Sequence, residues 1–411
     1  VSLTGETGRE TGGTMLKKAF IPSKGYYSTP FVRWQGSLAN ENSITLGAQT
    51  SKRWLATKDI DPKIFDYLML GVTIGQPALF YGGPWASALI GSTETAGLLV
   101  SQACSTSTTG IFQAAMGVEN GAWETVYNLY TDRCSNGPHT IWPNPKGPGG
   151  QVISENWVMD HFGNDPWAGG AMIETAENVI KLTGITREEC DATALRRAEQ
   201  YQDSLANDRE FQKRYMFPVE IRVSKKKTIQ IDSDEGIMPT TAEGLKGLRP
   251  VLPGGKLTFG AQTHPADGHC ALIVTDQEKA KELSDDKNIE IQIISFGHAR
   301  VKKAHMPMAP VPAALMALDR AGLTVDDLKV IKTHNPFAAN DIYMSKQMNL
   351  DINTFNNYGS SLVFGHPQAP TAGRSIIEGI EEAVILGGGY VLFTGCAAGD
   401  TSAALVLKVG K

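Results

Sequence analysis

Two cysteines follow apolar segments of strand length, and small residues follow each of them. Cys104 ends Leu98–Cys104 and precedes Ser105–Gly121, a run of small residues and helix formers, while Cys396 ends the similar segment Tyr390–Cys396. The N-terminus of a helix stabilises a thiolate through its free N–H groups and its dipole, which favours a nucleophilic thiol. A free cysteine is also commonly a buried apolar residue. For Cys104 the sequence leaves both interpretations open.

Two histidines lie in segments that constrain the backbone. His366 lies in Gly365-His366-Pro367, ahead of a helix predicted at Gly373–Leu386, and His334 begins His334-Asn335-Pro336-Phe337, directly after a strand predicted at Val330–Thr333. An imidazole beside a thiol can accept its proton and activate it as a nucleophile. Taken singly, a loop histidine such as His366 is by default a surface residue or a hydrogen-bonding one. For His334–Phe337, the default interpretation is that the segment forms a turn.

The other polar features give weaker evidence for a functional site. His264, His269, His298 and His305 lack a regular metal-ligand spacing, so we predict no metal site among them. The basic run Lys225–Lys227 is by default a solvated face, although it could meet cofactor phosphates. Five cysteines without a Cys-x-x-Cys pair argue against a disulfide framework or a cysteine-rich zinc site, and they favour a reducing compartment.

Length and charge set broad limits. The 411 residues allow two to three domains or one duplicated architecture. With 38 Lys and Arg against 43 Asp and Glu, the net charge is -5, which gives no argument for binding nucleic acid or an anionic membrane. No apolar stretch approaches the roughly 20 residues of a transmembrane helix. Residues 1–14 are polar, and we expect a flexible extension with the folded part beginning near Met15.

Strand and helix patterns alternate along the chain, which predicts an α/β fold. Strands are predicted at Lys18–Pro22, Asp66–Val72, Leu98–Cys104, Glu220–Val223, Thr228–Ile231, Asn288–Phe296, Val330–Thr333 and Tyr390–Cys396, and helices at Ser43–Leu55, Ser105–Gly121, from Thr186 to about Leu205, Val311–Ala321 and Gly373–Leu386. Two halves that each contain a strand ending in cysteine suggest an internal duplication. Residues 134–258 begin with a stretch rich in proline and tryptophan, and we interpret them as an insertion over the core.

The first cysteine, the His-led motif, the Gly-His-Pro loop and the second cysteine, in this order, resemble the thiolase superfamily from about Met15 onward. Four further segments match family patterns: Met172–Glu177, Thr186–Asp191, Gly260–Gly268, and Met306 with Pro310–Ala313.

The chain also departs from the family. His334-Asn335-Pro336-Phe337 replaces the Asn-Glu-Ala-Phe of degradative and biosynthetic thiolases, and its leading His is similar to the His-Asp-x-Phe of sterol-carrier-type thiolases. Cys396-Ala397-Ala398-Gly399 replaces Cys-x-Gly-Gly-Gly, and Ala261-Gln262-Thr263 replaces Asn-Ala-Ser. The four catalytic positions, Cys104, His334, His366 and Cys396, still hold residues that can perform the chemistry. We therefore expect the changes to alter the substrate pocket.

The resemblance implies a thiolase fold, in which two duplicated βαβαβαββ halves form a five-layered αβαβα core with an inserted loop domain. Residues 15–133 and 259–275 would form the N-terminal half, 134–258 a lid covering CoA, and 276–411 the C-terminal half.

The resemblance also implies a CoA-dependent cleavage of a 3-oxoacyl-CoA, or the reverse Claisen condensation, with CoA as substrate and no bound cofactor or metal. Cys104 would carry the acyl group, and His366 would accept its thiol proton. His334 and His366 would face the CoA thioester oxygen, and Cys396 would act as acid and base. Backbone N–H groups of Cys104 and Ala398 would form the oxyanion hole. The substrate pocket is expected to include Thr263, Met172, Met306, Phe337 and Gly399.

Two alternatives remain. One-way condensing enzymes, such as the ketosynthase and hydroxymethylglutaryl-CoA synthase relatives, use a cysteine nucleophile without the second catalytic cysteine, so Cys396 argues against them. A thiolase-like subunit that binds CoA without catalysis would not need the full set of four residues.

The departures favour a bulky, branched, aromatic or dicarboxylic acyl chain, as in anaerobic aromatic β-oxidation. The resemblance further implies a cytoplasmic homodimer or tetramer, with a small zinc-ribbon/OB-fold protein as a possible partner.

Overall fold

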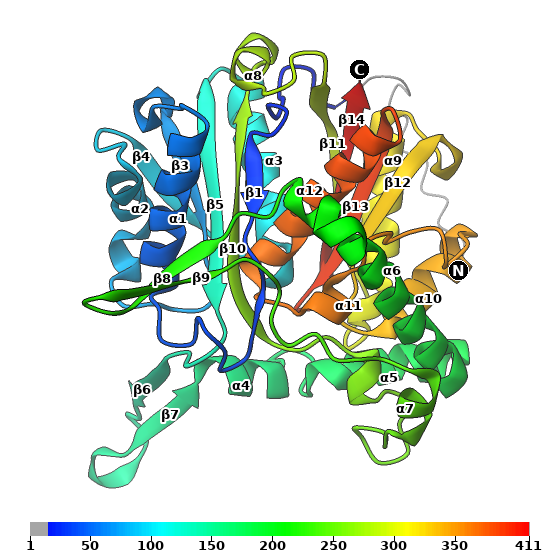
Figure 1. The fold of residues 1–411 in the computed structure, drawn as a ribbon. Coiled ribbons are helices and arrows are strands. Elements are labelled where there is room, and N and C mark those ends of the chain that lie inside the picture. Colours follow the sequence, from blue (N-terminus) through cyan, green and yellow to red (C-terminus); the bar gives the residue numbers. More distant parts are fainter. Residues whose placement is uncertain (1–14, 411) are drawn as a thin grey trace.

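The computed structural model describes residues 15–410, and two β-sheets organise it (Figure 1). The first sheet has the strand order β1-β10-β5-β3-β4, with β2 paired to β10, and the second has the order β11-β14-β13-β12. The strands of the first sheet are β1 (Tyr26–Ser28), β2 (Val32–Arg33), β3 (Tyr67–Gly71), β4 (Ala96–Val100), β5 (Thr125–Arg133) and β10 (Ala266–Thr275). Those of the second are β11 (Glu290–Arg300), β12 (Leu328–His334), β13 (Gly389–Ala397) and β14 (Thr401–Gly410).

Helices cover both sheets and fill the space between them, which gives five layers. The outer layer of the first sheet contains α1 (Ser43–Thr57) and α2 (Gly82–Ile90), and that of the second contains α9 (Pro310–Ala321), packed in turn against α10 (Ala338–Met348). The central layer consists of α3 (Thr106–Glu119) and α12 (Ala369–Ile385), which contact each other and strands of both sheets. This arrangement confirms the predicted α/β thiolase fold.

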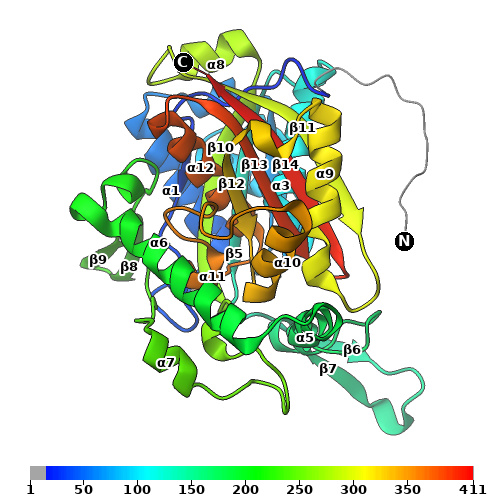
Figure 2. The same cartoon turned by 90° about the vertical axis from the view of Figure 1, so that its right-hand side faces the viewer.

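The remaining elements lie outside these layers. Between β5 and β10 the chain forms β6 (His139–Pro143), β7 (Val152–Asn156), α4 (Trp157–Gly163), α5 (Met172–Thr183), α6 (Arg187–Lys213), β8 (Val219–Ser224), β9 (Lys227–Ile231) and α7 (Ala242–Gly247). Figures 1 and 2 both show α4, α5, α7 and the β6–β7 hairpin at one end of the two sheets. Two short helices, α8 (Gln277–Leu283) and α11 (Ser361–Phe364), complete the set, and no described helix is long and apolar enough to cross a membrane.

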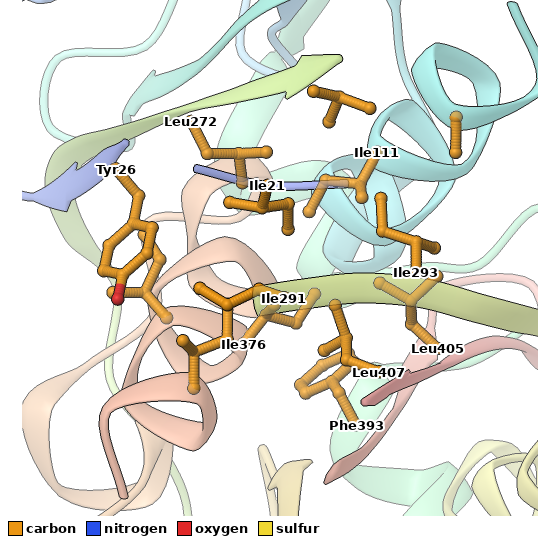
Figure 3. Packing of buried hydrophobic residues seen from close by; sticks show 14 of the residues in the cluster. Ile21, Tyr26, Ile111, Leu272, Ile291, Ile293, Ile376, Phe393, Leu405 and Leu407 are labelled. Atoms are coloured by element: carbon orange, nitrogen blue, oxygen red, sulfur yellow. The ribbon is translucent and has the colours of Figure 1, made fainter. Parts of the chain in front are cut away.

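The largest apolar cluster lies between the sheets and around the two central helices (Figure 3). Ile111 of α3 and Ile376 of α12 are fully buried there, together with Leu272 of β10 and Leu405 of β14. Removing this much apolar surface from water is the main force that holds both sheets to one central layer.

A close approach between α3 and α12 fixes the relative position of their N-termini. A Cβ atom on Gly373 of α12 would lie 3.3 Å from Ser107 Cβ of α3 and 2.5 Å from Cys270 Sγ of β10, so only glycine fits at this position. The Gly373 N–H donates to Ser107 Oγ at 2.7 Å. The segments that precede the two helices are thereby brought together.

Two sequence predictions need correction. Lys18–Pro22 is not a strand: Phe20 alone forms bridges, to Thr275 of the first sheet and Gln292 of the second, because this segment passes where the sheets adjoin. Strand β4 ends at Val100, where its pairing with β3 ends, and not at Cys104. The helix predicted from Thr186 to about Leu205 is confirmed, because non-helical backbone at residues 206–209 separates it from a further helical stretch that ends at Lys213. The predicted flexible extension at 1–14 lies outside the described residues.

Candidate active site

Cys104 lies in a tight turn between β4 and α3. The turn is a single 3₁₀ segment, Ala103–Ser105, in which Ala103 has a positive φ of 45°. The Gln102 N–H donates to Thr106 Oγ1 at 2.8 Å and closes the turn. This geometry holds the half-buried Cys104 at the wall of a cavity, close to the start of α3.

His366 faces this thiol from the loop before α12. The loop requires a positive φ of 90° at Gly365, a conformation that glycine adopts readily. His366 Nε2 lies 3.0 Å from Cys104 Sγ, and His366 Nδ1 lies 2.6 Å from Thr371 Oγ1. Burial, and then the neighbouring His334, lower the pKa of His366 well below its ordinary value. The imidazole is therefore neutral at pH 7 and able to accept a proton.

His334 is the last residue of β12, and its ring lies beside that of His366. The two ring centroids are 4.1 Å apart. His334 Nδ1 lies 2.8 Å from Ser361 Oγ, whereas the buried Nε2 has no hydrogen-bond partner. Burial lowers the pKa of His334 to about 3. A neutral imidazole thus keeps one free ring nitrogen inside the site.

Cys396 is fully buried near the end of β13, next to the strand that carries His334. Asn340 of α10 donates from Nδ2 to Cys396 Sγ at 3.2 Å. Burial and the nearby Cys104 raise the pKa of Cys396 well above its ordinary value, while the Asn340 hydrogen bond opposes this. The resting side chain is a thiol, which has a proton to give.

Burial also raises the pKa of Cys104, to about 12. The backbone N–H groups of Ala398 and Cys104 itself act in the opposite direction, because they point toward the sulfur. The Cys104 thiol can also donate to Gln368 Oε1, at 3.3 Å. In the resting site, Cys104 and His366 are therefore a neutral thiol and imidazole.

A buried carboxylate anchors the start of α12. Asp132, near the end of β5, accepts hydrogen bonds from the N–H groups of Thr73, Ile74 and Ala369 at 2.8–2.9 Å, and from Thr73 Oγ1. Burial raises the pKa of Asp132 to about 7, against the effect of these donors. Asp132 therefore ties the segment that follows His366 to the first sheet.

The thiol opens onto a cavity of about 680 Å³ between the sheets and the insertion. All five predicted pocket residues line it, namely Thr263, Met172, Met306, Phe337 and Gly399. The insertion contributes an aromatic group, Trp157, Phe162 and Trp167. Lys225–Lys227 lie at the exposed β8–β9 turn and do not line the cavity.

Sequence reasoning missed the residues that hold the four predicted side chains in place. They are Asp132, Asn340, Ser361, Gln368 and Thr371. Asn340 lies six residues after His334, and Ser361 and Thr371 lie five residues before and after His366, so proximity in sequence gave a signal for three of them. Asp132 gave none, because it lies in no motif. Gln368 lies two residues after His366, but its partner Cys104 is 264 residues away, so its contact with the thiol could not be predicted.

Comparisons with known proteins agree with this geometry. The thiolase N-terminal domain model matches residues 25–278, and the thiolase C-terminal domain model matches 287–409. A probable acetyl-CoA acetyltransferase of Mycolicibacterium smegmatis is 27% identical over 92% of this chain and 98% of its own length. A 3-ketoacyl-CoA thiolase of Aliivibrio fischeri is 28% identical over 93% of each chain.

Solved structures show the same fold. Human mitochondrial 3-ketoacyl-CoA thiolase superposes with a TM-score of 0.87 at 24% identity, covering 96% of this chain and 99% of that one. The acetyl-CoA acetyltransferase of Bacillus anthracis gives 0.88 at 24% identity, covering 97% of this chain and all of that one. Because the two family models together span almost all of the described residues, the chain belongs to the thiolase family and is an acyltransferase of that family.

Proposed function

We propose that this protein catalyses the CoA-dependent cleavage of a 3-oxoacyl-CoA, or the reverse condensation, through an acyl group carried on Cys104. The observation that carries the proposal is the 3.0 Å contact between Cys104 Sγ and His366 Nε2. It joins a nucleophile to a base at the wall of a cavity that is large enough for an acyl chain.

Acyl transfer begins when Cys104 attacks the 3-oxo carbon and His366 Nε2 takes the thiol proton. Because the imidazole is neutral and hydrogen-bonded at Nδ1, it can accept that proton without reorienting. The developing oxyanion on the former 3-oxo carbon accepts hydrogen bonds from the N–H groups of Cys104 and Ala398. One donor of this kind typically contributes roughly 10²–10³ in rate.

The bond between C2 and C3 then breaks and leaves an enolate on the departing acyl-CoA. His334 and His366 face the thioester oxygen of this enolate and stabilise its charge, for which the free Nε2 of His334 is suited. Cys396 gives its thiol proton to C2, or removes a proton there in the condensation direction. The thiol of a second CoA molecule gives its proton to the Cys396 thiolate and attacks the acyl-Cys104. The shortened acyl-CoA leaves, and His366 returns its proton to the Cys104 sulfur.

The cavity favours an uncharged, bulky acyl chain, and in particular an aromatic one. Trp157, Phe162 and Phe337 offer ring faces and edges against which an aryl group can pack. No Lys or Arg is among the described residues that line the cavity, so a dicarboxylic chain would lack a counter-ion there. Of the predicted acyl classes, the aromatic one used in anaerobic aromatic β-oxidation therefore has the most support.

We further propose that the insertion 134–258 acts as a lid over CoA, and that the enzyme is a cytoplasmic homodimer or tetramer. The aromatic side chains that the insertion places around the cavity support the lid, and five free cysteines suit a reducing compartment. A small zinc-ribbon/OB-fold protein is proposed as a partner on the family resemblance alone.

The test is CoA-dependent loss of 3-oxoacyl-CoA, followed for acetoacetyl-CoA and for 3-oxo-3-phenylpropionyl-CoA, with and without the candidate partner. We expect a higher kcat/KM for the aromatic substrate, and at least about a 10³-fold lower kcat for Cys104→Ala. The matched control, Cys190→Ala, changes a buried cysteine that does not line the cavity and should keep activity. Full activity in Cys104→Ala contradicts the mechanism, and CoA binding without turnover favours a non-catalytic subunit.

A further inference from the structure

We propose that Cys104, His334 and His366 form a binding site for Zn²⁺, and that the bound ion reversibly inhibits the enzyme. Within residues 15–410 this is the one group of three His, Cys, Asp or Glu side chains whose potential ligand atoms all lie within 4.8 Å of one another. The four histidines that we predicted not to bind metal are not part of it. Two imidazoles and a thiolate are donors that zinc prefers.

The hydrogen bonds around the two histidines leave the correct ring atoms available. His334 Nδ1 contacts Ser361 Oγ, and His366 Nδ1 contacts Thr371 Oγ1, at 2.8 and 2.6 Å. Both Nε2 atoms remain on the side of the thiol, and that of His334 is buried without a partner. Metal-binding histidines are usually held in this manner, with the second ring nitrogen donating to a fixed acceptor. His334 would therefore bind the ion as the tautomer protonated at Nδ1, whereas the tautomer protonated at Nε2 is the one that donates to the enolate oxygen.

The separations suit a metal after small side-chain movements. With bond lengths of about 2.0–2.3 Å, tetrahedral zinc places its ligand atoms about 3.3–3.6 Å apart. The observed distances range from 3.0 Å, between Cys104 Sγ and His366 Nε2, to no more than 4.8 Å. The fourth coordination position would be filled by water from the adjoining cavity.

Coordination requires two neutral imidazoles and a thiolate. The Cys104 thiol must lose its proton to bind the ion, and that proton is released to solvent. Affinity for Zn²⁺ should therefore rise with pH. Bond formation involves only donation of lone pairs and consumes no oxidant or reductant.

The leading His of the motif determines whether this site exists. Where degradative and biosynthetic thiolases carry Asn-Glu-Ala-Phe, this chain has His334, and an Asn in its place would leave only one nitrogen ligand and one sulfur ligand in the group. If our proposed function holds, the metal occupies the atoms that attack the substrate and contact its thioester oxygen. Inhibition should then be competitive with the acyl-CoA and should be reversed by a chelator.

The direct test uses the full chain, treated with a chelator, and Co²⁺ as a spectroscopic probe for the same site. We expect one Co²⁺ per chain, a sulfur-to-cobalt charge-transfer band, and displacement of the cobalt by Zn²⁺. His334→Asn should weaken Zn²⁺ binding at least tenfold by calorimetry. The matched control is His161→Gln, because His161 also lines the cavity but lies 3.0 Å from Glu155 and outside the group. Its Zn²⁺ affinity should be unchanged.

The absence of a charge-transfer band, or a loss of binding in His161→Gln, overturns the proposal. A second measurement needs no variant of the site: Zn²⁺ should slow alkylation of Cys104 by iodoacetamide in the unmodified protein, and a chelator should restore the rate. Alkylation that is insensitive to Zn²⁺ also overturns it. These two readouts do not require turnover, so they stay informative even if the proposed reaction is wrong.

Discussion

At the scale of single residues, the reactive groups of the site are in their neutral forms before substrate binds. Burial raises the pKa of Cys104 to about 12 and lowers the pKa of its partner His366, so transferring the proton from sulfur to nitrogen is unfavourable in the empty site. Substrate must shift this balance, because an oxyanion next to the N–H groups of Cys104 and Ala398 makes the imidazolium easier to form. The nucleophile is thereby activated in the presence of its target.

This leads to a prediction on pH dependence. A raised pKa means that the thiolate fraction of free enzyme is negligible at pH 7 and increases about tenfold for each pH unit up to the pKa. The rate of Cys104 alkylation by iodoacetamide should therefore rise steadily from pH 7 to 10 without reaching a plateau. The rate is followed by intact-protein mass spectrometry, and Cys104→Ala provides the background from the other four cysteines, all buried. A plateau near pH 7 would mean that the resting pair is ionised.

The chemical residues could be predicted from the sequence because short motifs mark them. Cys104, His334, His366 and Cys396 each stand beside a strand end, a glycine or a proline, and each of these features is local. The contacts that orient them are not local. Gln368 accepts a hydrogen bond from the Cys104 thiol, although the two residues are 264 positions apart in the sequence. Its backbone φ is 64°, a conformation that no sequence pattern predicts.

At the scale of elements, the strand predictions were right where pairing is regular and wrong at the ends. Strand β4 continues only as far as its pairing with β3, and the chain then turns through Ala103 toward Cys104. The predicted strand Leu98–Cys104 included this turn because Ala103 and Cys104 are apolar, although Ser101 and Gln102 are polar and Ser101 is exposed. Lys18–Pro22 is similarly apolar, but it has only single bridges to each sheet.

One buried ion pair connects the insertion to the helix that follows His366. Asp234, located after β9, forms hydrogen bonds with Arg374 of α12 at 2.7 and 2.8 Å, and both side chains are almost completely buried. Asp234 also accepts from the Phe31 N–H and from the Tyr201 hydroxyl. The carboxylate thus connects three separate parts of the chain.

Asp234→Ala should lower the free energy of unfolding by about 3–5 kcal/mol, because it leaves the buried Arg374 guanidinium without this partner. Urea denaturation measures this change. The control is Asp232→Ala two residues earlier, where a mostly exposed carboxylate lies 3.6 Å from Arg209 and the expected change is at most about 1 kcal/mol. Equal effects of the two substitutions would show that the buried ion pair contributes no more to the free energy of unfolding than the exposed one.

At the scale of the whole molecule, one edge of the first sheet is open. Strand β4 ends the strand order and pairs only with β3 among the described strands, so its other side presents free backbone groups. Apolar side chains are exposed on and near it: Leu99 is 42% exposed, Phe80 93% and Tyr81 65%. An unprotected edge strand with apolar neighbours is a template for pairing with another chain. This edge is consistent with the proposed homodimer.

If β4 pairs with the same strand of a second copy, Leu99→Asp combined with Phe80→Asp should convert the dimer to a monomer, because charges would then be buried at the contact. Sedimentation velocity measures the change. Leu315→Asp on α9 is the control, since Leu315 is 49% exposed but lies in the outer layer of the other sheet. Thiolysis should fall together with dimerisation, because Cys104 follows β4 by only four residues and depends on the position of that strand. A doubly substituted protein that remains dimeric would place the contact between copies elsewhere on the molecule.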